Sequence, residues 1–547
     1  MNLSNLGLSG IQTAQNRLQT AGHNINNAAT EGYNRQSVKV STAGAQATGA
    51  GYVGLGVQVD TIDRAYNNFL YRQLVDSQSK GAELGAYGTE ITQVNNIMAD
   101  RTVGISPALQ KFFDGMQAVA SSPADPAARQ ELLGRASSLV GQLNDTNAFL
   151  NDQRSNINTQ VNTVVRQINS YVERVHDLNN QIVTAKAAGS GHAPNDLLDK
   201  RDQAVAELNE LVGVNVIEQG DRFGLSFGRG QVLLSSDTVY PLQAGPSIDD
   251  PSRTVVSYAM PAGNGKTTMT EIGDQYIRGG KLGGLLQYRS QTLDAVQNDL
   301  GRLATGLAMA VNAQHEQGFD QVGRPGEAFF SLPDPSVSAS ERNQGNGEFS
   351  ASFVNANDLT ASDYQISYNG ANYSIVRQPD GNLMYEGTTF PVTIDGIEMD
   401  FSGTALAGDR WTMTPTRGSA SDIKLNISNP ASIAAAGSDA GDADNGNALK
   451  LAQLQTDKVL GNGTMSLNES FSQIVNTIGV QTQQNQTAQK AQDTLVQQNF
   501  AAQQAISGVN LNEEYVNLER YQEHFRAASR LIDVSSTLFD TLLSLRQ

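Results

Sequence analysis

The chain has 547 residues, well above the usual size of one domain, so we expect about two to four domains. Its formal net charge of −18 argues against a protein that neutralises nucleic-acid phosphates or docks on an anionic membrane. The absence of cysteine excludes disulfides, thiolate metal sites and a cysteine nucleophile. Hydrophobic residues make up 39% of the chain and aromatic residues only 6%, which favours aliphatic cores in an elongated helical architecture.

The first helical segment runs from Met1 to about Ala29 and carries a seven-residue repeat with two seam positions. The large residues of this repeat are Ile11, Leu18 and Ile25. The small residues of the second position are Gly7, Ala14, Ala21 and Ala28. A repeat of seven is typical of a helix that pairs with another helix. The Met1–Gly10 segment lacks the basic and apolar regions of a cleavable signal peptide, so we expect none.

The C-terminal segment has the same kind of seam over about four to five heptads. Its first position is held by Leu511, Leu518, Phe525, Ile532 and Phe539. Its second position is held by Tyr521, Ala528, Ser535 and Leu542. Because nothing nearby in the sequence covers either terminal stripe, we expect the termini to pair with each other or with neighbouring subunits.

The longest helical pattern lies between Leu143 and Ala185, about 45 residues that would extend about 65–70 Å. It ends at the helix breakers Gly189, Gly191 and Pro194, and we interpret its heptads as ordinary helical core. Shorter helices are predicted at 67–98, 196–211, 285–317 and 481–506. No stretch of about 18 apolar residues is present, so no membrane span is predicted.

Strand patterns occupy the middle of the chain, at 214–242, less clearly at 255–277, and most clearly at 353–414. The hairpin turns predicted in the last region are Asn369-Gly370, Pro379-Asp380-Gly381 and Asp395-Gly396. The segment 434–447 is small, acidic and glycine-rich, and we interpret it as a linker back into helix. The fold class predicted is mainly α with inserted β domains.

Three domains follow from this order of elements. A terminal coiled-coil domain takes 1–40 and 506–547, and an α-helical bundle takes 41–315 and 445–505. The bundle carries a small β insertion near 213–277, and the outer β-rich domain takes 316–444.

Three motifs suggest chemistry but lack the rest of the pattern. His315-Glu316 opens like a zinc-peptidase helix, but the second histidine position is Phe319. The segment 263–267 imitates the end of a phosphate-binding loop without the earlier glycine. Asp439, Asp442 and Asp444 have the wrong spacing for a calcium loop. We therefore predict no enzyme, no metal site and no cofactor.

Several stretches near the termini carry a family likeness. His23–Ala28 is an asparagine-rich turn that precedes Thr30-Glu31-Gly32-Tyr33, and Arg35-Gln36 follows it. The C-terminal stretches with the likeness are 507–514, 521–525, 528–532 and 538–543, with 445–449 where helix resumes. In these residues the chain resembles the rod–hook–junction family of flagellar axial proteins, and its junction members more than its hook members. Asn512, Tyr515 and Glu519 depart from that pattern without changing the assignment.

The resemblance implies a structural subunit between hook and filament of the bacterial flagellum, an extracellular part of the motility apparatus. It implies polymerisation through the terminal seams, Ile11, Leu18, Ile25, Leu511, Leu518, Tyr521, Phe525, Ile532, Phe539 and Leu542. The partners implied are further copies in a ring, the hook protein, the second junction protein with the filament, and an export chaperone bound to the C-terminal segment. Type III export without a cleavable signal is implied too, with no nucleic-acid or membrane partner.

Two alternatives remain open at this point. One is a hook or rod subunit of the same family, from which the Gly508–Glu514 stretch would distinguish a junction subunit. The other is a secreted adhesin or peptidase, which would need a ligand pocket or a catalytic set of residues.

Overall fold

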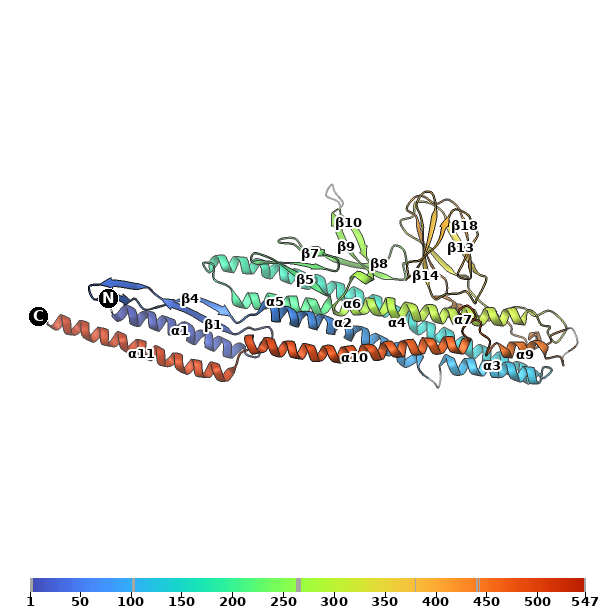
Figure 1. Ribbon diagram of the computed structural model, residues 1–547, viewed down its shortest axis with the longest axis horizontal. Helices are drawn as coiled ribbons and strands as arrows, with labels where there is room; N and C mark the ends of the chain where they lie inside the picture. The colour runs from blue at the N-terminus through green and yellow to red at the C-terminus, as the bar shows by residue number, and fades with distance from the viewer. Residues whose placement is uncertain are drawn as a thin grey trace.

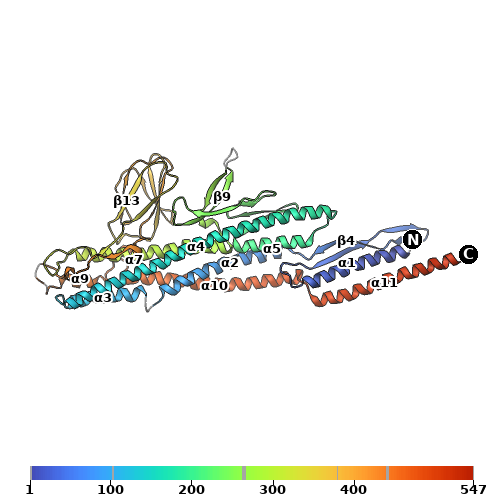
Figure 2. The ribbon, with the colours of Figure 1, turned by 180° about the vertical axis from the view of Figure 1, so that it is seen from behind.

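The computed structural model describes residues 3–100, 104–261, 267–378, 380–438, 441 and 443–545. The molecule is elongated, and most of its helices run along the long axis (Figure 1). Both chain termini lie at one end, and two groups of strands stand on one side of the helices (Figure 2). Within the described ranges, no helix is both long enough and apolar enough to span a bilayer.

The end that holds the termini is built from both ends of the chain. Helix α1, Leu3–Asn27, packs along α11, Leu511–Ser544, so the two terminal helices pair within one chain. A long hairpin arm lies on the other side of α1 (Figures 1 and 2). Its antiparallel strands are β1, Gln36–Thr42, and β4, Val57–Arg64, near the body, and β2, Ala45–Thr48, and β3, Gly51–Gly54, farther out.

The helical body forms the long middle of the molecule. Its helices are α2, Asn68–Met98; α3, Ile105–Ser121; α4, Pro126–Ala188; α5, Asn195–Leu211; α6, Gly280–Tyr288; α7, Asp294–His315; α8, Ser419–Asp422; α9, Gly446–Gln453; and α10, Leu467–Ser507. A π-helical segment, Arg289–Leu293, joins α6 to α7. Single 3-10 turns lie at Asp274–Tyr276 and Pro430–Ser432.

Local sequence explains where the long helices begin and which face they bury. The Asp125 side chain accepts a hydrogen bond from the Ala127 amide, and Pro126 takes the first turn of α4, where its missing N–H costs nothing. The heptad positions of α4, including Leu143 and Ile157, are buried in the core of the body. Helix α10 begins with a reciprocal capping box between Ser466 and Glu469.

Two small sheets form an inner β layer on the helical body. The first sheet has the order β5-β6-β7, with strands Val214–Gln219, Arg222–Phe227 and Gln231–Leu234. The second has the order β8-β9-β10, with strands Leu242–Pro246, Thr254–Pro261 and Thr267–Ile272. Leu225, Phe227 and Val256 belong to the same hydrophobic core as the helices, so this layer is part of the body.

The outer β domain has a core of its own around Ile366, Met399 and the only tryptophan, Trp411. Its five-stranded sheet, β12-β19-β14-β15-β16, has strands Ser336–Ala339, Arg410–Thr414, Asp363–Tyr368, Tyr373–Gln378 and Leu383–Gly387. Its three-stranded sheet, β13-β18-β17, has strands Glu348–Phe353, Ile397–Ser402 and Val392–Ile394. A short pair, β11, Phe330–Ser331, and β20, Lys424–Leu425, lies at its base.

The turns predicted in this domain occur where they were expected. Asn369-Gly370 joins β14 to β15, and Asp395-Gly396 joins β17 to β18 with positive φ at both residues. Asp380-Gly381 lies between β15 and β16, while Pro379 falls outside the described residues.

Several helix bounds differ from the prediction. Helix α4 spans 63 residues instead of about 45, and α10 starts at Leu467 rather than at Gln481. The helix predicted at 285–317 starts at Gly280, ends at His315 and contains the π segment. Polar and small residues weaken the seven-residue pattern in these stretches, but capping and tertiary packing extend the helices beyond it.

Other elements were missed or misplaced. Helix α3 and the arm were not predicted, whereas α9 begins where helix was expected to resume, at 445–449. The predicted linker leads into α9 as expected, but its first residues, Ala434 and Ala435, are fully buried (0% exposed) against the body.

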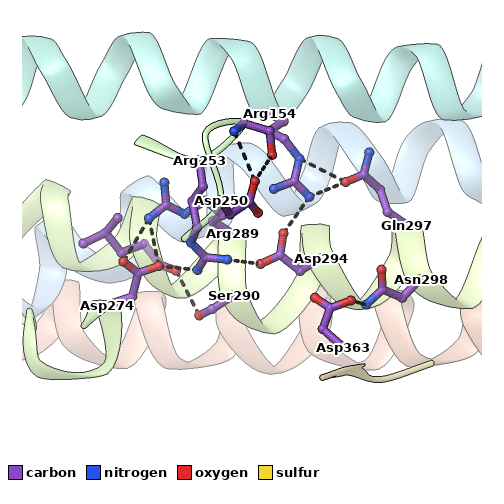
Figure 3. A network of polar contacts seen from close by, with 12 residues as sticks. Arg154, Asp250, Arg253, Asp274, Arg289, Ser290, Asp294, Gln297, Asn298 and Asp363 are labelled. Carbon is purple, nitrogen blue, oxygen red and sulfur yellow. Dashed lines mark hydrogen bonds and ion pairs between the residues drawn. The ribbon is translucent and has the colours of Figure 1, made fainter. Parts of the chain in front are cut away.

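A buried network of charges joins the helices to the inner β layer (Figure 3). Arg154 of α4 donates to Asp294 of α7 at 2.6 Å, and Arg253 donates to the other oxygen of Asp294 at 2.8 Å. Arg253 also reaches Asp274 at 2.5 Å, and Arg289 of the π segment reaches the same carboxylate at 2.8 Å. Burial raises the pKa of Asp294, but the charges of Arg253 and Arg154 outweigh it and hold that pKa well below its usual range.

The same region anchors the outer β domain. Arg417, which follows β19, pairs with Asp363 of β14 and with Asp250 of the inner layer, the latter at 3.1 Å. Asn298 of α7 donates to Asp363 at 3.0 Å (Figure 3). The root of the outer domain is therefore held by directional polar contacts to two other parts of the molecule.

Replacing Asp294 by alanine is expected to destabilise the body by about 3–5 kcal/mol, because the buried Arg154 guanidinium loses its carboxylate partner and Arg253 loses one of its two. Urea unfolding followed by helical circular dichroism measures this. Asp221→Ala is the matched control: it removes the exposed pair with Lys186 at 2.6 Å and should cost less than about 1 kcal/mol. Equal losses in the two variants would contradict a structural role for the network.

Candidate assembly interface at the chain termini

Small residues allow α1 to lie very close to α11. A Cβ atom at Gly7 would stand 2.6 Å from Cγ1 of Ile532 and 3.0 Å from the carbonyl oxygen of Ala528. A Cβ at Gly10 would stand 3.0 Å from Cβ of Ala528. The hydroxyls of Ser4 and Ser535 share a hydrogen bond of 2.7 Å across the pair. Since helix separation depends on the side chains in contact, this pair is closer than one packed through large residues.

The interface in α1 is centred on the small residues of the repeat. Gly7, Ala14 and Ala21 are buried, whereas the predicted seam residues Ile11, Leu18 and Ile25 are only half-buried. The sequence shows the small-residue repeat, but the predicted assembly seam contains only the large residues of α1. Large apolar side chains on α1 therefore remain available to a partner outside the chain.

The seam residues of α11 divide along the helix. Ala528 and Ser535 are buried against α1, and Leu518, Tyr521, Phe525 and Ile532 are half-buried. Leu511, Phe539 and Leu542 are 43%, 61% and 67% exposed. The structure thus brings the middle of the predicted seam together with α1 and leaves its two ends uncovered within one chain.

The last turns of α11 and Leu545 after them carry a further apolar surface, which shares Leu542 with the seam and which we call the outer stripe. Its residues recur at helical spacing, and their exposed fractions are 39% for Leu531, 52% for Val534, 50% for Leu538, 67% for Leu542 and 79% for Leu545. A contiguous exposed apolar surface of this kind is typical of a protein–protein contact.

The asparagine-rich turn forms a polar joint between the terminal helices and the arm. Asn24, at 1% exposure, accepts hydrogen bonds from the Tyr33 hydroxyl at 2.7 Å and the Gln36 amide at 2.9 Å. Its amide group donates to the Gln36 carbonyl at 2.9 Å and to Glu514 at 3.2 Å. The side-chain oxygen of Asn24 therefore accepts two hydrogen bonds and its NH2 group donates two. Through these bonds Asn24 fixes the turn to the start of α11.

Arg35 ties the same turn to α11 and α10. Its side chain donates to Glu514 at 2.9 Å and to Glu513 at 3.1 Å, and its amide donates to the Ser507 carbonyl at 2.9 Å. Glu514 is 3% exposed and Glu513 is exposed, so the first pair is the stronger contact. The two carboxylates also lie in the first turn of α11, where the helix dipole favours negative charge.

A second set of contacts fixes the turn to the helical body. The Asn34 side chain donates to Asp199 of α5 at 2.6 Å, and the Asn34 amide donates to its other oxygen at 3.0 Å. Arg64 at the end of β4 bridges Asp199 at 2.8 Å and Asp202 at 2.6 Å. Burial raises the pKa of both aspartates, although Arg64 acts in the opposite direction.

The phenol of Tyr33 is held protonated in this joint. Burial, together with the charges of Asp196, Asp199 and Glu514, raises the pKa of Tyr33 above its ordinary value. It therefore remains a hydrogen-bond donor to Asn24. The sequence showed this turn as a family likeness, but nothing in it indicated the partners on α5 and α11.

The candidate chemical motifs have structural explanations or fall outside the described residues. The amide of Ala434 donates to Nε2 of His315 at 2.8 Å, and Nδ1 lies 2.6 Å from the Glu327 carbonyl, so both ring nitrogens are used. Burial lowers the pKa of His315 to about 4. Among the described residues no cluster of three possible metal ligands is present. Residues 263–266, Asp439 and Asp442 lie outside the described residues, and Asp444 accepts from the amides of its own loop.

Two family models match the chain. One, described as "Flagellar hook-associated protein FlgK helical domain", matches residues 91–330. The other, described as "Flagellar hook-associated protein 1, D2-like domain", matches residues 338–415. The first covers much of the helical body with the inner β layer, and the second covers most of the outer β domain.

Known proteins are similar over the whole length. Flagellar hook-associated protein 1 of Salmonella typhimurium is 36% identical over 562 aligned positions, which cover 100% of both chains. The protein of that name from Escherichia coli K12 is also 36% identical with 100% of both chains covered. The solved structure of the flagellar hook junction protein FlgK from Burkholderia pseudomallei has a TM-score of 0.74 and 30% identity, covering 80% of this chain and 100% of that one.

Gly7→Leu is expected to separate α1 from α11, because its side chain would collide with Ile532 and the Ala528 carbonyl. The readout is a disulfide between Ser4→Cys and Ser535→Cys in the cysteine-free chain, whose native hydroxyls are 2.7 Å apart. The disulfide should form in the parent and be lost with Gly7→Leu. Gly22→Leu in the same helix is the control, since nothing lies within 4 Å of a Cβ there. Equal cross-linking in both variants would contradict the close contact.

Proposed function

This chain belongs to the flagellar hook-associated protein 1 family, and on that premise we propose that it is a structural subunit of the junction between the flagellar hook and the filament. The observation that carries the proposal is likeness along the entire chain, 36% identity with 100% coverage of proteins of that name. The fold adds support, because its TM-score is 0.74 with a protein described as a flagellar hook junction protein. A hook or rod subunit is disfavoured, since the relatives matched are junction proteins.

The partners proposed are other copies of the chain, arranged as a ring, with the hook protein on one side and the second junction protein and filament on the other. The half-buried seam residues of α1 and the uncovered ends of the α11 seam support contacts between copies through the termini. The helical body would form the wall of the axial structure, and the outer β domain would face outward. The separate core of that domain fits such a position.

The termini are proposed to order fully only on assembly. A lone amphipathic helix is marginal in water, and α11 buries few residues in the single chain, so much of its stabilisation must come from neighbours. Weakly held terminal helices also suit a chain that is threaded unfolded through a type III export channel. The exposed apolar surface of α11 supports a chaperone that shields the C-terminal segment before export.

A mechanical rather than a catalytic role is part of the proposal. Buried charged groups such as Arg154, Arg253 and Asp294 pair with one another, and burial lowers the pKa of His315, whose two ring nitrogens contact backbone groups. The contacts of these groups lie within the body, so a structural role accounts for them.

Leu518→Glu or Phe525→Glu is expected to abolish filament assembly while the helical body stays folded. Each substitution places a charge in the half-buried seam of α11, where burying an unpaired carboxylate is costly. The variants would be expressed in a strain deleted for the native gene, with filaments counted by electron microscopy and folding checked by circular dichroism. Gln522→Glu adds the same charge at an exposed position of the same helix and should leave filament number unchanged.

Filaments at parental number with Leu518→Glu or Phe525→Glu would contradict assembly through this seam. A deletion strain that swims without the gene would contradict the junction role itself. Loss of hooks along with filaments would point to the hook or rod alternative.

A further inference from the structure

In the outer part of the arm, residues 43–56, every residue from 44 to 55 is exposed, and Gly56 at its base lies against Ser9 of α1. All eight residues of β2 and β3 are exposed, and Tyr52 is 82% exposed with Val53 at 44% and Leu55 at 39%. The ladder is regular, with backbone bonds such as Ala43 to Gly56 at 3.0 Å and Leu55 to Gly44 at 2.9 Å. The inner strands β1 and β4 pack on α1, but the contact ends near Ser9, whose hydroxyl accepts from the Val57 amide at 3.4 Å.

This outer part also lacks the features that protect an isolated hairpin. Two strands alone are marginally stable in water, and exposed strand edges are normally guarded by charged side chains or proline. The segment 43–56 contains no charged residue and no proline. A regular, neutral ribbon with exposed tyrosine, valine and leucine is typical of a surface that contacts another molecule.

The outer stripe of α11 is also apolar and nearly uncharged, and it lies at the same end of the molecule as the arm (Figure 1). The only charged residues from 531 to 545 are Asp533 and Asp540. The arm and α11 lie on opposite sides of α1 in both views (Figures 1 and 2). The two surfaces cannot meet within one copy, but they can meet between copies placed side by side.

We propose that the arm tip of one copy packs on the outer stripe of α11 of the adjacent copy. The inference rests on the proposed function, since it requires copies arranged around a common axis. Where copies lie side by side with their long axes parallel, the arm of one copy faces the terminal end of its neighbour. Different surfaces on the two sides of one subunit make a head-to-tail contact, which is the kind that closes into a ring.

Symmetry favours the helix stripe over a second arm as the occupant. Arm-to-arm contact would pair identical surfaces, which closes a dimer and leaves both outer stripes uncovered. If the arm instead contacts the outer stripe of the next copy, one repeated interface covers both the arm tip and the outer stripe of every copy. Tyr52 then supplies the aromatic side chain from one face of the ribbon, and Leu538 and Leu542 supply the surface that it covers.

The test replaces Tyr52 by p-benzoyl-phenylalanine in the full chain, expressed in a strain deleted for the native gene. Irradiated flagella should yield a product of two copies of this chain, joined between position 52 and residues 531–545 by mass spectrometry of the peptides. A second readout uses coexpressed Tyr52→Cys and Leu538→Cys copies, which should give a disulfide-linked dimer on mild oxidation. Tyr52→Cys with Ser535→Cys is the control and should give none, since Ser535 is buried against α1.

The outcomes separate the inference from the function on which it rests. Filaments restored by the full chain with no product from position 52, or with cross-links to a different protein, would overturn the arm contact and leave the junction role standing. Equal dimer with Ser535→Cys would also overturn it. If the unaltered full chain restores no filaments, the junction role fails and the inference fails with it.

Discussion

The close contact between α1 and α11 is the constraint on which the rest of the molecule depends. It joins the first and the last helices of a chain of 547 residues, so everything between them is an insertion between two paired ends. The contact is possible because Gly7 and Gly10 leave room for Ile532 and Ala528. A pair held by such small residues buries little apolar area by itself, which leaves the large apolar side chains on both helices for neighbours.

The polar joint orients the pair of α1 and α11 relative to the helical body. Asn24 and Arg35 connect the turn to the start of α11, and Asn34 and Arg64 connect it to α5 of the body. Charged groups also hold the outer β domain, through Arg417 and its two aspartates. Apolar cores make each part rigid, and directional ion pairs set the angle between parts. This arrangement suits a subunit that transmits load between two different tubes.

The sequence predicted features that local chemistry determines. Heptads predicted the long helices, and Asn369-Gly370 and Asp395-Gly396 predicted turns that occur in the structure. Small-residue repeats in α1 were noticed, but which of two seam positions meets α11 depends on the partner helix, and hydrophobicity alone pointed to Ile11, Leu18 and Ile25. The outer part of the arm was missed because its sequence, rich in glycine and alanine, gives no clear alternating pattern. The contacts of Asn34 with Asp199 join residues 165 positions apart, and no local pattern contains them.

The most direct test of the account is to express the chain without Asn510–Gln547 in a strain deleted for the native gene, beside the full chain. Hooks and filaments would be scored by electron microscopy, and flagellin would be assayed in the medium. The account predicts hooks without filaments and flagellin lost to the medium for the truncated chain, with filaments restored by the full chain. Filaments assembled on the truncated chain would contradict the claim that the paired termini carry assembly.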